Sequence, residues 1–237
     1  MKVYRYKKED EYTYALGATV VMEYLLNNPS LVQGVIFHPD FTSIETIKHI
    51  EEICTAKGIE LDTQAKPFNI VSSKENCFCM AIIRKVNETS LDGNHVVLVN
   101  PSNAGNLGTI IRSCIGFGVE DIAIILPAVD LFDPKTIRAS MGAKAKIRIE
   151  LFENFQEYEK RFHKNNMYPF MLDGSKKLHE TKIEKPFSLI LGNEATGLAK
   201  EFAVVGQPVR IDQSDKIDSL NLPIATSIGL FYSTTMN

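Results

Sequence analysis

The sequence predicts an α/β protein in which a small α/β domain precedes a larger domain with a mostly parallel sheet. After residue 94, short apolar segments alternate with helical patterns, which is typical of a parallel sheet covered on both faces. A polar, turn-rich stretch at 87–94 is expected to be the linker. The 237 residues are 44% hydrophobic, enough for a sizeable core, and this length suits one large domain or two smaller ones. The expected domains are 1–88 and 95–237.

The first domain is predicted to contain two helices and two strands. Apolar residues recur at helical spacing from Tyr14 to Leu25, and Asn27-Asn28-Pro29 ends that helix. Thr42-Ser43-Ile44-Glu45 has the pattern of a capping box, which predicts a second helix that Gly58 terminates. The expected strands cover residues 31–37 and 77–86.

The second domain is predicted to alternate strands with helices. The candidate strands are 95–99, 121–126, 146–151, 168–172, 187–191 and 208–211. The candidate helices lie near 106–116, 133–141, 154–164, 197–204 and 221–235. Each strand is short and apolar, as expected for strands buried on both faces.

Composition narrows the function classes. No apolar run is long enough to span a bilayer, and the first residues carry no secretory signal, so a cytoplasmic location is expected. The four cysteines and five histidines lack zinc-ligand spacing, and we expect no metal. A net charge of −3 argues against tight non-specific binding of nucleic acid, although it leaves room for a local basic face.

Three polar clusters, the first two of which contain glycines, lie where apolar runs end. In the first, the strand 95–99 leads into a helix near Asn106, and Gly108 lies one turn before Arg112. The start of this helix favours a polar or anionic ligand. Two other interpretations remain open: a structural Arg112 at the edge of the core, paired with a carboxylate, and a dinucleotide site, which the incomplete glycine pattern supports only weakly.

The second and third clusters each have a structural alternative. Gly192 and Glu194 follow the strand 187–191, at the end where open α/β sheets bind ligands, but they could also form a simple turn. The stretch Asp218-Ser219-Leu220-Asn221 precedes Pro223 and could serve only to cap the last helix.

Three basic residues form a candidate RNA-binding face. Lys144, Lys146 and Arg148 alternate with apolar residues, which on a strand places the three charges on one side, where they could hold phosphates. A plain solvated strand face is the alternative.

Together the clusters resemble the three motifs of the SpoU family, the 2'-O-ribose RNA methyltransferase branch of the SPOUT superfamily. Residues 106–112 resemble the first motif, N-x-G-x-[IL]-x-R; residues 191–198 resemble the second, G-[NA]-E-x-x-G-[LM]; residues 211–221 resemble the third. The resemblance covers 95–237, and residues 1–88 resemble, less firmly, an L30e-like RNA-binding domain.

The resemblance implies an enzyme that transfers methyl groups from S-adenosylmethionine to RNA, as a homodimer whose pockets are each completed by the partner subunit. It also implies a deep trefoil knot in the C-terminal part of the chain. The positions that match active-site residues are Arg112, Asn106, Glu194, Ser219 and Asn221. Those that match the cofactor site are Leu191, Gly192, Gly197, Ile211 and Leu220.

The chain departs from the family pattern in the third motif. Asp212-Gln213 stands where Pro-Met is usual, and Asp212 is expected to face the sulfonium or the ribose. A guanidinium is a poor base at neutral pH, so two roles for Arg112 remain open. It could stabilise the forming alkoxide while a substrate phosphate takes the proton, or desolvation could make it the base.

Alternative functions also remain. The chain could be a catalytically inactive RNA-binding protein of the same fold, or a methyltransferase acting on another atom, such as a guanine nitrogen. Ribosomal RNA is the expected substrate rather than transfer RNA, because the first domain resembles a ribosomal-protein module.

Overall fold

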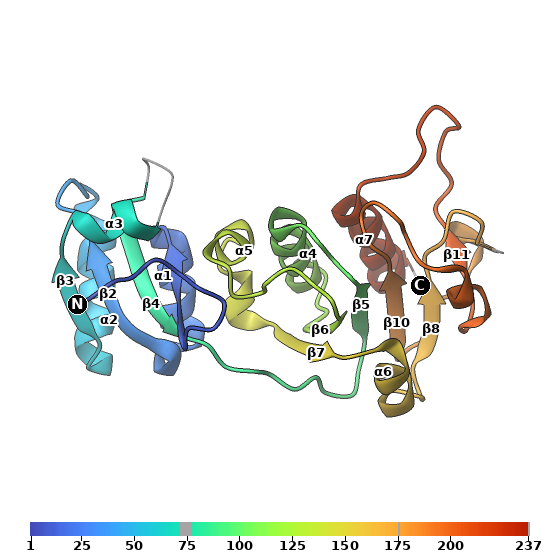
Figure 1. Ribbon diagram of the computed structural model, residues 1–237, viewed down its shortest axis with the longest axis horizontal. Coiled ribbons are helices and arrows are strands. Elements are labelled where there is room, and N and C mark those ends of the chain that lie inside the picture. The colour runs from blue at the N-terminus through green and yellow to red at the C-terminus, as the bar shows by residue number, and fades with distance from the viewer. Residues whose placement is uncertain (72–76, 175, 237) are drawn as a thin grey trace. The chain divides into compact units, whose positions relative to one another are not determined.

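The computed structural model describes residues 1–71, 77–174 and 176–236. The chain divides into two compact units (Figure 1). The first unit comprises Met1–Val86 and Asp130–Lys146, and the second comprises Asn87–Val129 and Ile147–Asn237.

A four-stranded sheet of order β1-β4-β2-β3 forms the centre of the first unit. β4 pairs antiparallel with β1 and β2, and β3 pairs parallel with β2. The strands are β1 (Tyr12–Leu16), β2 (Val32–Phe37), β3 (Glu60–Thr63) and β4 (Cys79–Arg84). The helices of this unit are α1 (Ala18–Asn27), α2 (Ile44–Lys57), α3 (Lys66–Val71) and α5 (Pro134–Ala139).

Side-chain alternation along these strands builds a core on each face of the sheet. On one face, Ala15, Val35 and Ala81 pack with buried residues of α1 and α2. On the other face, Leu16 and Met80 pack with Phe68 of α3 and with the first residues of the chain.

The predicted first helix is wrong at its start, because residues 12–16 form β1 and α1 begins only at Ala18. Gly17 separates the two with a φ of 102°, a conformation that favours glycine. β3 and α3 were not predicted. The termination of α2 is confirmed, since Gly58 adopts the left-handed conformation with a φ of 67°.

The segment Asp130–Lys146 belongs to the first unit, whereas the sequence placed it in the domain 95–237. Ile137 and Ala145 are buried in the core beneath α1 and α2. The Thr13 hydroxyl donates to the Phe132 carbonyl (2.6 Å), and the Asn28 amide donates to the Ala145 carbonyl (2.6 Å). Burial and hydrogen bonding both tie the segment to the first unit.

Ile137→Ala is therefore expected to destabilise the first unit, although residue 137 lies outside the first 88 residues. Ile137 has no exposed surface, and large-to-small changes at such sites cost about 2–5 kcal/mol. Urea denaturation followed by circular dichroism measures the loss. The exposed Lys135→Ala on the same helix is the control. A change below about 0.5 kcal/mol for Ile137→Ala, as at ordinary surface sites, contradicts this placement.

A five-stranded parallel sheet of order β7-β6-β5-β10-β8 forms the centre of the second unit. The strands are β5 (His95–Val99), β6 (Asp121–Ile125), β7 (Arg148–Phe152), β8 (Asn166–Pro169) and β10 (Phe187–Leu191). The helices are α4 (Ala104–Gly116), α6 (Phe155–Arg161) and α7 (Leu222–Phe231). Figure 1 shows α4 and α7 on one side of the sheet and α6 on the other.

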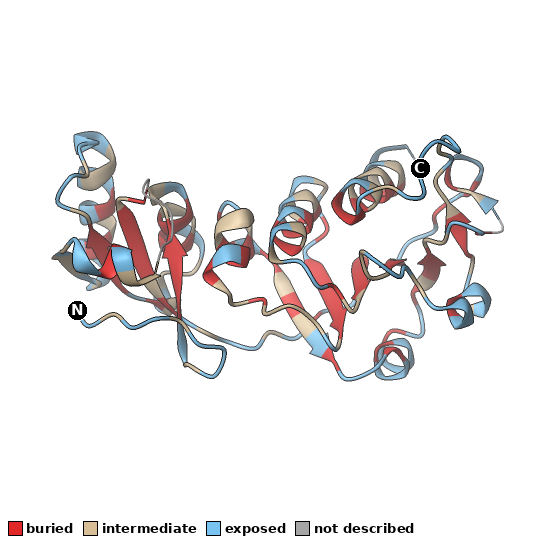
Figure 2. Cartoon of the chain, turned by 45° about the horizontal axis from the view of Figure 1, so that its top comes forward, coloured by how far each residue is buried: buried red, intermediate tan, exposed pale blue. Residues whose placement is uncertain are grey.

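The buried strands separate the two helical layers of this unit (Figure 2). Ile190 packs with Phe155 and Tyr158 of α6, whereas its neighbour Leu189 lies beside Gly229 of α7. β10 is inserted between β5 and β8, so the order of strands reverses at the β5–β10 pair. Ligands bind at such reversal points in open α/β sheets, outside the carboxyl ends of the strands.

A small two-stranded sheet lies after β8. β9 (Lys176–Lys177) pairs parallel with β11 (Val209–Arg210), and Val209 also bridges to Phe170. The helix predicted at 197–204 is instead a short 3-10 helix, Lys200–Val204. The loop 211–221 follows β11 and leads directly into α7.

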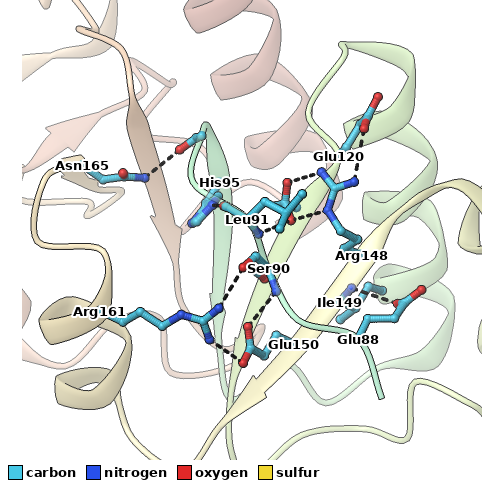
Figure 3. A network of polar contacts seen from close by, with 12 residues as sticks. Glu88, Ser90, Leu91, His95, Glu120, Arg148, Ile149, Glu150, Arg161 and Asn165 are labelled. Carbon is cyan, nitrogen blue, oxygen red and sulfur yellow. Dashed lines mark hydrogen bonds and ion pairs between the residues drawn. The ribbon is translucent and has the colours of Figure 1, made fainter. Parts of the chain in front are cut away.

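The predicted linker is held by side chains of the second unit (Figure 3). The Ser90 amide donates to the Glu150 carboxylate (2.7 Å), and Arg161 donates to the Ser90 carbonyl (2.8 Å). The Leu91 amide donates to Asp121 (3.1 Å). These bonds attach residues 90 and 91 to β6, β7 and α6. This part of the predicted linker is therefore an integral part of the second unit.

Candidate active site

Two asparagines join the loops that follow β5 and β10. Asn100 has a φ of 53°, which asparagine tolerates better than most residues. Its backbone carbonyl accepts a hydrogen bond from the side-chain Nδ2 of Asn193 (2.7 Å). The side-chain Oδ1 of Asn193 in turn accepts from the backbone amides of Ala195 (2.9 Å) and Thr196 (3.3 Å). The two strand ends therefore form one connected rim.

Gly192 is required at this rim because another part of the backbone approaches it closely. A Cβ at residue 192 would lie against the Gly197 carbonyl carbon and the Leu198 nitrogen, well inside van der Waals contact. The Gly197 amide also donates to the Asn193 carbonyl (2.9 Å). The 192–198 loop is thus folded tightly on itself directly after β10.

Glu194 connects this loop to the start of α4. One of its carboxylate oxygens accepts from the Ser102 amide (2.9 Å) and hydroxyl (2.8 Å). The other accepts from the Asn103 amide (3.1 Å) and the Asn106 side chain (3.2 Å). Asn103 is the N-cap of α4 and accepts from the Asn106 amide. Glu194 therefore contacts Asn106, another of the predicted active-site residues.

These contacts shift the titration of Glu194. Partial burial acts to raise its pKa, but hydrogen bonds from Ser102 and Asn106 outweigh burial, and the pKa lies below the ordinary value of 4.5. A carboxyl group with a lowered pKa adds stability above its unfolded pKa, and that stability disappears as pH falls through the folded pKa.

Glu194→Gln is expected to lower the thermal midpoint at neutral pH. The difference from wild type should shrink as the pH falls below about 4.5 and the wild-type carboxylate becomes protonated. Thermal melts between about pH 7 and about pH 3 measure it. Glu184→Gln, at an exposed position, is the control. A Glu194→Gln difference that persists unchanged at low pH contradicts the role given to these hydrogen bonds.

A pocket of about 620 Å³ opens beside this rim. All five residues predicted to bind the cofactor line it, as do Glu194 and Ser219. Its walls come from the segment after β8, the loop after β10, the loop after β11 and the start of α7. The remaining lining includes the apolar Met171, Leu198 and Leu222 and the charged Asp173, Lys200 and Asp218.

The other predicted active-site residues lie outside this lining. Asn106 is bonded to Glu194 instead. Asn221 occupies the N-cap position of α7 without a side-chain capping bond. Arg112 is exposed, and its guanidinium forms no hydrogen bond or ion pair within residues 1–71, 77–174 and 176–236. The alternative of a structural Arg112 paired with a carboxylate is therefore wrong for the described part of the chain.

The profile of the SpoU rRNA Methylase family matches residues 93–231. The chain belongs to the SpoU family. The matched range contains all three polar clusters and every strand of the parallel sheet. The resemblance seen in the motifs is thus confirmed at the level of the family.

Relatives and solved structures agree with this assignment. An uncharacterized tRNA/rRNA methyltransferase of Synechocystis is 29% identical over 57% of this chain and 51% of the relative. The 23S rRNA (adenosine(1067)-2'-O)-methyltransferase of Streptomyces laurentii is 31% identical over 60% of this chain and 54% of the relative. The matches therefore span about half the length of these two curated relatives.

A crystal structure extends the similarity to nearly the whole chain. The AdoMet-bound rRNA methyltransferase from Sinorhizobium meliloti has a TM-score of 0.79 at 27% identity. The match covers 94% of this chain and 87% of that protein. The α/β fold with a mostly parallel sheet is thus the fold of a solved member of this enzyme class.

The predicted basic face of this SpoU chain is not formed. Residues 143–146 are a 3-10 helix, and β7 starts only at Arg148, so the three side chains do not alternate along one strand. Lys144 is buried, and Lys146 pairs with Glu23 (2.7 Å). Arg148 makes a two-pronged contact with Asp121 (2.8 and 2.6 Å). Two of the three charges that were expected to hold RNA are thus used in ion pairs, and the third side chain is buried.

The unusual Asp212-Gln213 pair is split between two environments. Gln213 lines the pocket, whereas Asp212 does not, so the expectation that Asp212 faces the cofactor is wrong. Its carboxylate contacts Lys177 (3.1 Å), Arg210 (3.6 Å) and His179 (3.7 Å). These cations, led by the hydrogen bond from Lys177, hold the pKa of Asp212 below its ordinary value.

Sequence reasoning missed several residues that build the site. Asn193 lies inside the second motif, between Gly192 and Glu194, and its position there was a usable signal. Ser102 precedes the first motif and offers a hydroxyl at a helix start, which is also visible in the sequence. The positive φ of Asn100 and the pocket-facing Gln213 carry no such signal.

Among the residues that the structure describes, no group of three or more His, Cys, Asp or Glu side chains is arranged to hold a metal ion. None of the described helices is both long and apolar enough to cross a membrane.

Proposed function

We propose that this SpoU chain transfers a methyl group from S-adenosylmethionine to a ribose 2'-hydroxyl of structured RNA, with ribosomal RNA as the favoured substrate. One observation carries the proposal. Residues of the second and third motifs line a single pocket, and Glu194 connects that pocket to Asn106 of the first motif. Residues from three motifs that are far apart in sequence therefore lie together beside the carboxyl ends of the parallel strands.

The pocket suits S-adenosylmethionine in size and chemistry. Its volume is within the range of about 300–1,000 Å³ found for small-ligand sites. Leu191, Ile211 and Leu220 offer apolar surface for an adenine ring. Asp173 and Asp218 offer negative charge for the amino and sulfonium groups, and Lys200 offers positive charge for the carboxylate.

The proposed chemistry needs alignment and charge stabilisation. The bound cofactor supplies a methyl group already activated by its sulfonium. Ser219 and the loop around it hold the attacking ribose oxygen in line with that methyl group. Arg112 stabilises the negative charge that develops on the oxygen, while a substrate phosphate accepts the proton. Glu194 fixes Asn106 at the same edge.

We propose that the protein is a homodimer in which Arg112 of one subunit reaches the pocket of the other. The guanidinium is exposed and does not line the pocket of its own chain. Apolar side chains are exposed nearby on the α4–α7 layer: Ile224 is 52% and Phe231 46% exposed, and Phe231 stacks edge-to-face on Phe117. A second copy that covers this apolar surface would bring Arg112 to the partner's pocket.

Two finer features of the family belong to the same proposal. The insertion of β10 between β5 and β8, and the return of the chain at β11 beside β9, are compatible with a deep trefoil knot. The first unit would act as an L30e-like domain that binds the RNA substrate. Its four-stranded sheet has a helical layer on each face.

Mapping of 2'-O-methyl groups in cellular RNA, with and without the protein, tests the function. Loss of one methylated ribosomal nucleotide supports the proposal in full. Loss of a transfer RNA site keeps the reaction and changes the substrate. An unchanged methylation map, together with no binding of S-adenosylmethionine in calorimetry, contradicts the proposal and favours a catalytically inactive RNA-binding protein.

A further inference from the structure

One wall of the pocket is a loop with a short attachment at its start. Residues 211–220 contribute Ile211, Gln213, Ser219 and Leu220 to the lining. This loop leaves β11, which pairs with β9 at only two positions. A ladder of two residues supplies too few hydrogen bonds to hold a loop in one position.

Asp212 adds an ionic attachment at this weak point. It is the first residue after Ile211, and its carboxylate contacts Lys177 of β9 (3.1 Å) and Arg210 of β11 (3.6 Å). His179 approaches the same carboxylate at 3.7 Å. One side chain therefore joins both strands of the small sheet, between two residues that line the pocket.

The far end of the loop depends on the same attachment. The Gln213 side chain donates from Nε2 to the Asp218 carbonyl (3.2 Å), which closes the loop on itself. Ser219 and Leu220, the next residues after Asp218, line the pocket. A displacement at Asp212 would therefore be transmitted through Gln213 to the opposite part of the wall.

We propose that Asp212 is a positioning residue that anchors the 211–220 loop in the conformation that binds S-adenosylmethionine. The inference rests on the proposed function of the pocket. Where the SpoU motif usually has proline, whose ring restricts the backbone directly, this chain uses an ion cluster. Exposed ion pairs are individually weak and salt-sensitive, but here one carboxylate contacts two cationic side chains, Lys177 and Arg210, as well as the imidazole of His179.

Cofactor binding to the full chain tests the anchor. For Asp212→Asn, calorimetry is expected to show an S-adenosylmethionine Kd raised by about threefold to tenfold at low salt. The wild-type affinity should fall between about 50 and about 500 mM sodium chloride, while that of Asp212→Asn should change little. Lys177→Met should weaken binding similarly, and the double variant should add little to either single change.

Lys176→Met is the matched control. It removes the same charge from the neighbouring residue of β9, which is exposed and forms no ion pair within the described chain. Successive residues of a strand point to opposite sides, so Lys176 is directed away from Asp212. Its Kd for S-adenosylmethionine and the salt dependence of that Kd should match wild type.

Hydrogen exchange of the ligand-free protein gives a second readout. The amides of residues 213–220 should exchange about threefold to tenfold faster in Asp212→Asn than in wild type or Lys176→Met, because the loop opens more often. Unchanged exchange overturns the anchor, whether or not the protein binds the cofactor.

The outcomes separate this inference from the proposed function. If wild type binds S-adenosylmethionine and Asp212→Asn binds it equally well, the inference fails and the proposed function stands. If wild type does not bind it, the proposed function fails, and the exchange data alone judge the anchor. If Lys177→Met weakens RNA binding but leaves cofactor affinity intact, the cluster is a phosphate site and the inference is overturned.

Discussion

Arg112→Ala is expected to lower the rate of RNA methylation by about 10²–10³-fold or more while S-adenosylmethionine binds nearly as in wild type. The guanidinium is the group proposed to stabilise the developing oxyanion, and it lies outside the proposed cofactor pocket of its own chain. Single-turnover methylation of RNA measures the first effect, and calorimetry measures the second. Retained turnover in this variant contradicts the central role of Arg112.

Dimers formed from two different variants test whether Arg112 acts in the pocket of its own chain or in that of the partner. Arg112→Ala chains keep an intact pocket, and Gly192→Ala chains keep Arg112. The assay is run at an S-adenosylmethionine concentration near the wild-type Kd, where both variants alone are nearly inactive. If Arg112 acts in the partner's pocket, an equal mixture should then regain about a quarter of wild-type activity, because half of the dimers are mixed and each mixed dimer has one complete site. No recovery would assign Arg112 to its own chain or remove it from the reaction.

Gly192→Ala is expected to raise the Kd for S-adenosylmethionine by about 10- to 100-fold. The added methyl group would overlap the backbone of Gly197 and Leu198, so the loop after β10 would have to move away from the pocket. Calorimetry measures the affinity, and circular dichroism verifies that the fold is retained. A Kd close to that of wild type contradicts the close approach seen here.

Gly118→Asn is the control for that change. Gly118 has a φ of 71°, which asparagine can adopt, and a Cβ there would meet no atom within 4 Å. Gly118 is exposed and does not line the pocket, so this substitution should leave cofactor affinity within about threefold of wild type. A large loss in Gly118→Asn would show that glycine substitutions in this unit weaken binding by general destabilisation, and the argument from steric overlap at Gly192 would lose its force.

The central strands of the second unit were predictable because each is mostly apolar and is followed by polar, proline or glycine residues. The predicted ranges 95–99 and 187–191 are the observed bounds of β5 and β10. In contrast, β3 has the sequence Glu-Leu-Asp-Thr and lies at the edge of its sheet, so it shows no apolar pattern. β1 was not predicted, because its apolar residues also fit the spacing of a helix.

The candidate site was partly predictable for a related reason. Residues of the second and third motifs lie where strands end, and their spacing in the sequence predicts those positions. The partners of long charged side chains cannot be predicted from spacing in the same way. Asp212 was expected to face the cofactor and instead binds Lys177. Lys144 and Lys146 have the alternation of a strand, yet four residues of 3-10 helix carry them.

Because Asp130–Lys146 belongs to the first unit, that unit is not one continuous segment that could be exchanged between homologues. The backbone passes from one unit to the other at three places: after residues 86, 129 and 146. A single cut near residue 88 would leave the front half without Ile137 and Ala145, which fill its interior. Chimeras that swap the first unit between homologues must therefore transplant two separate pieces of sequence together.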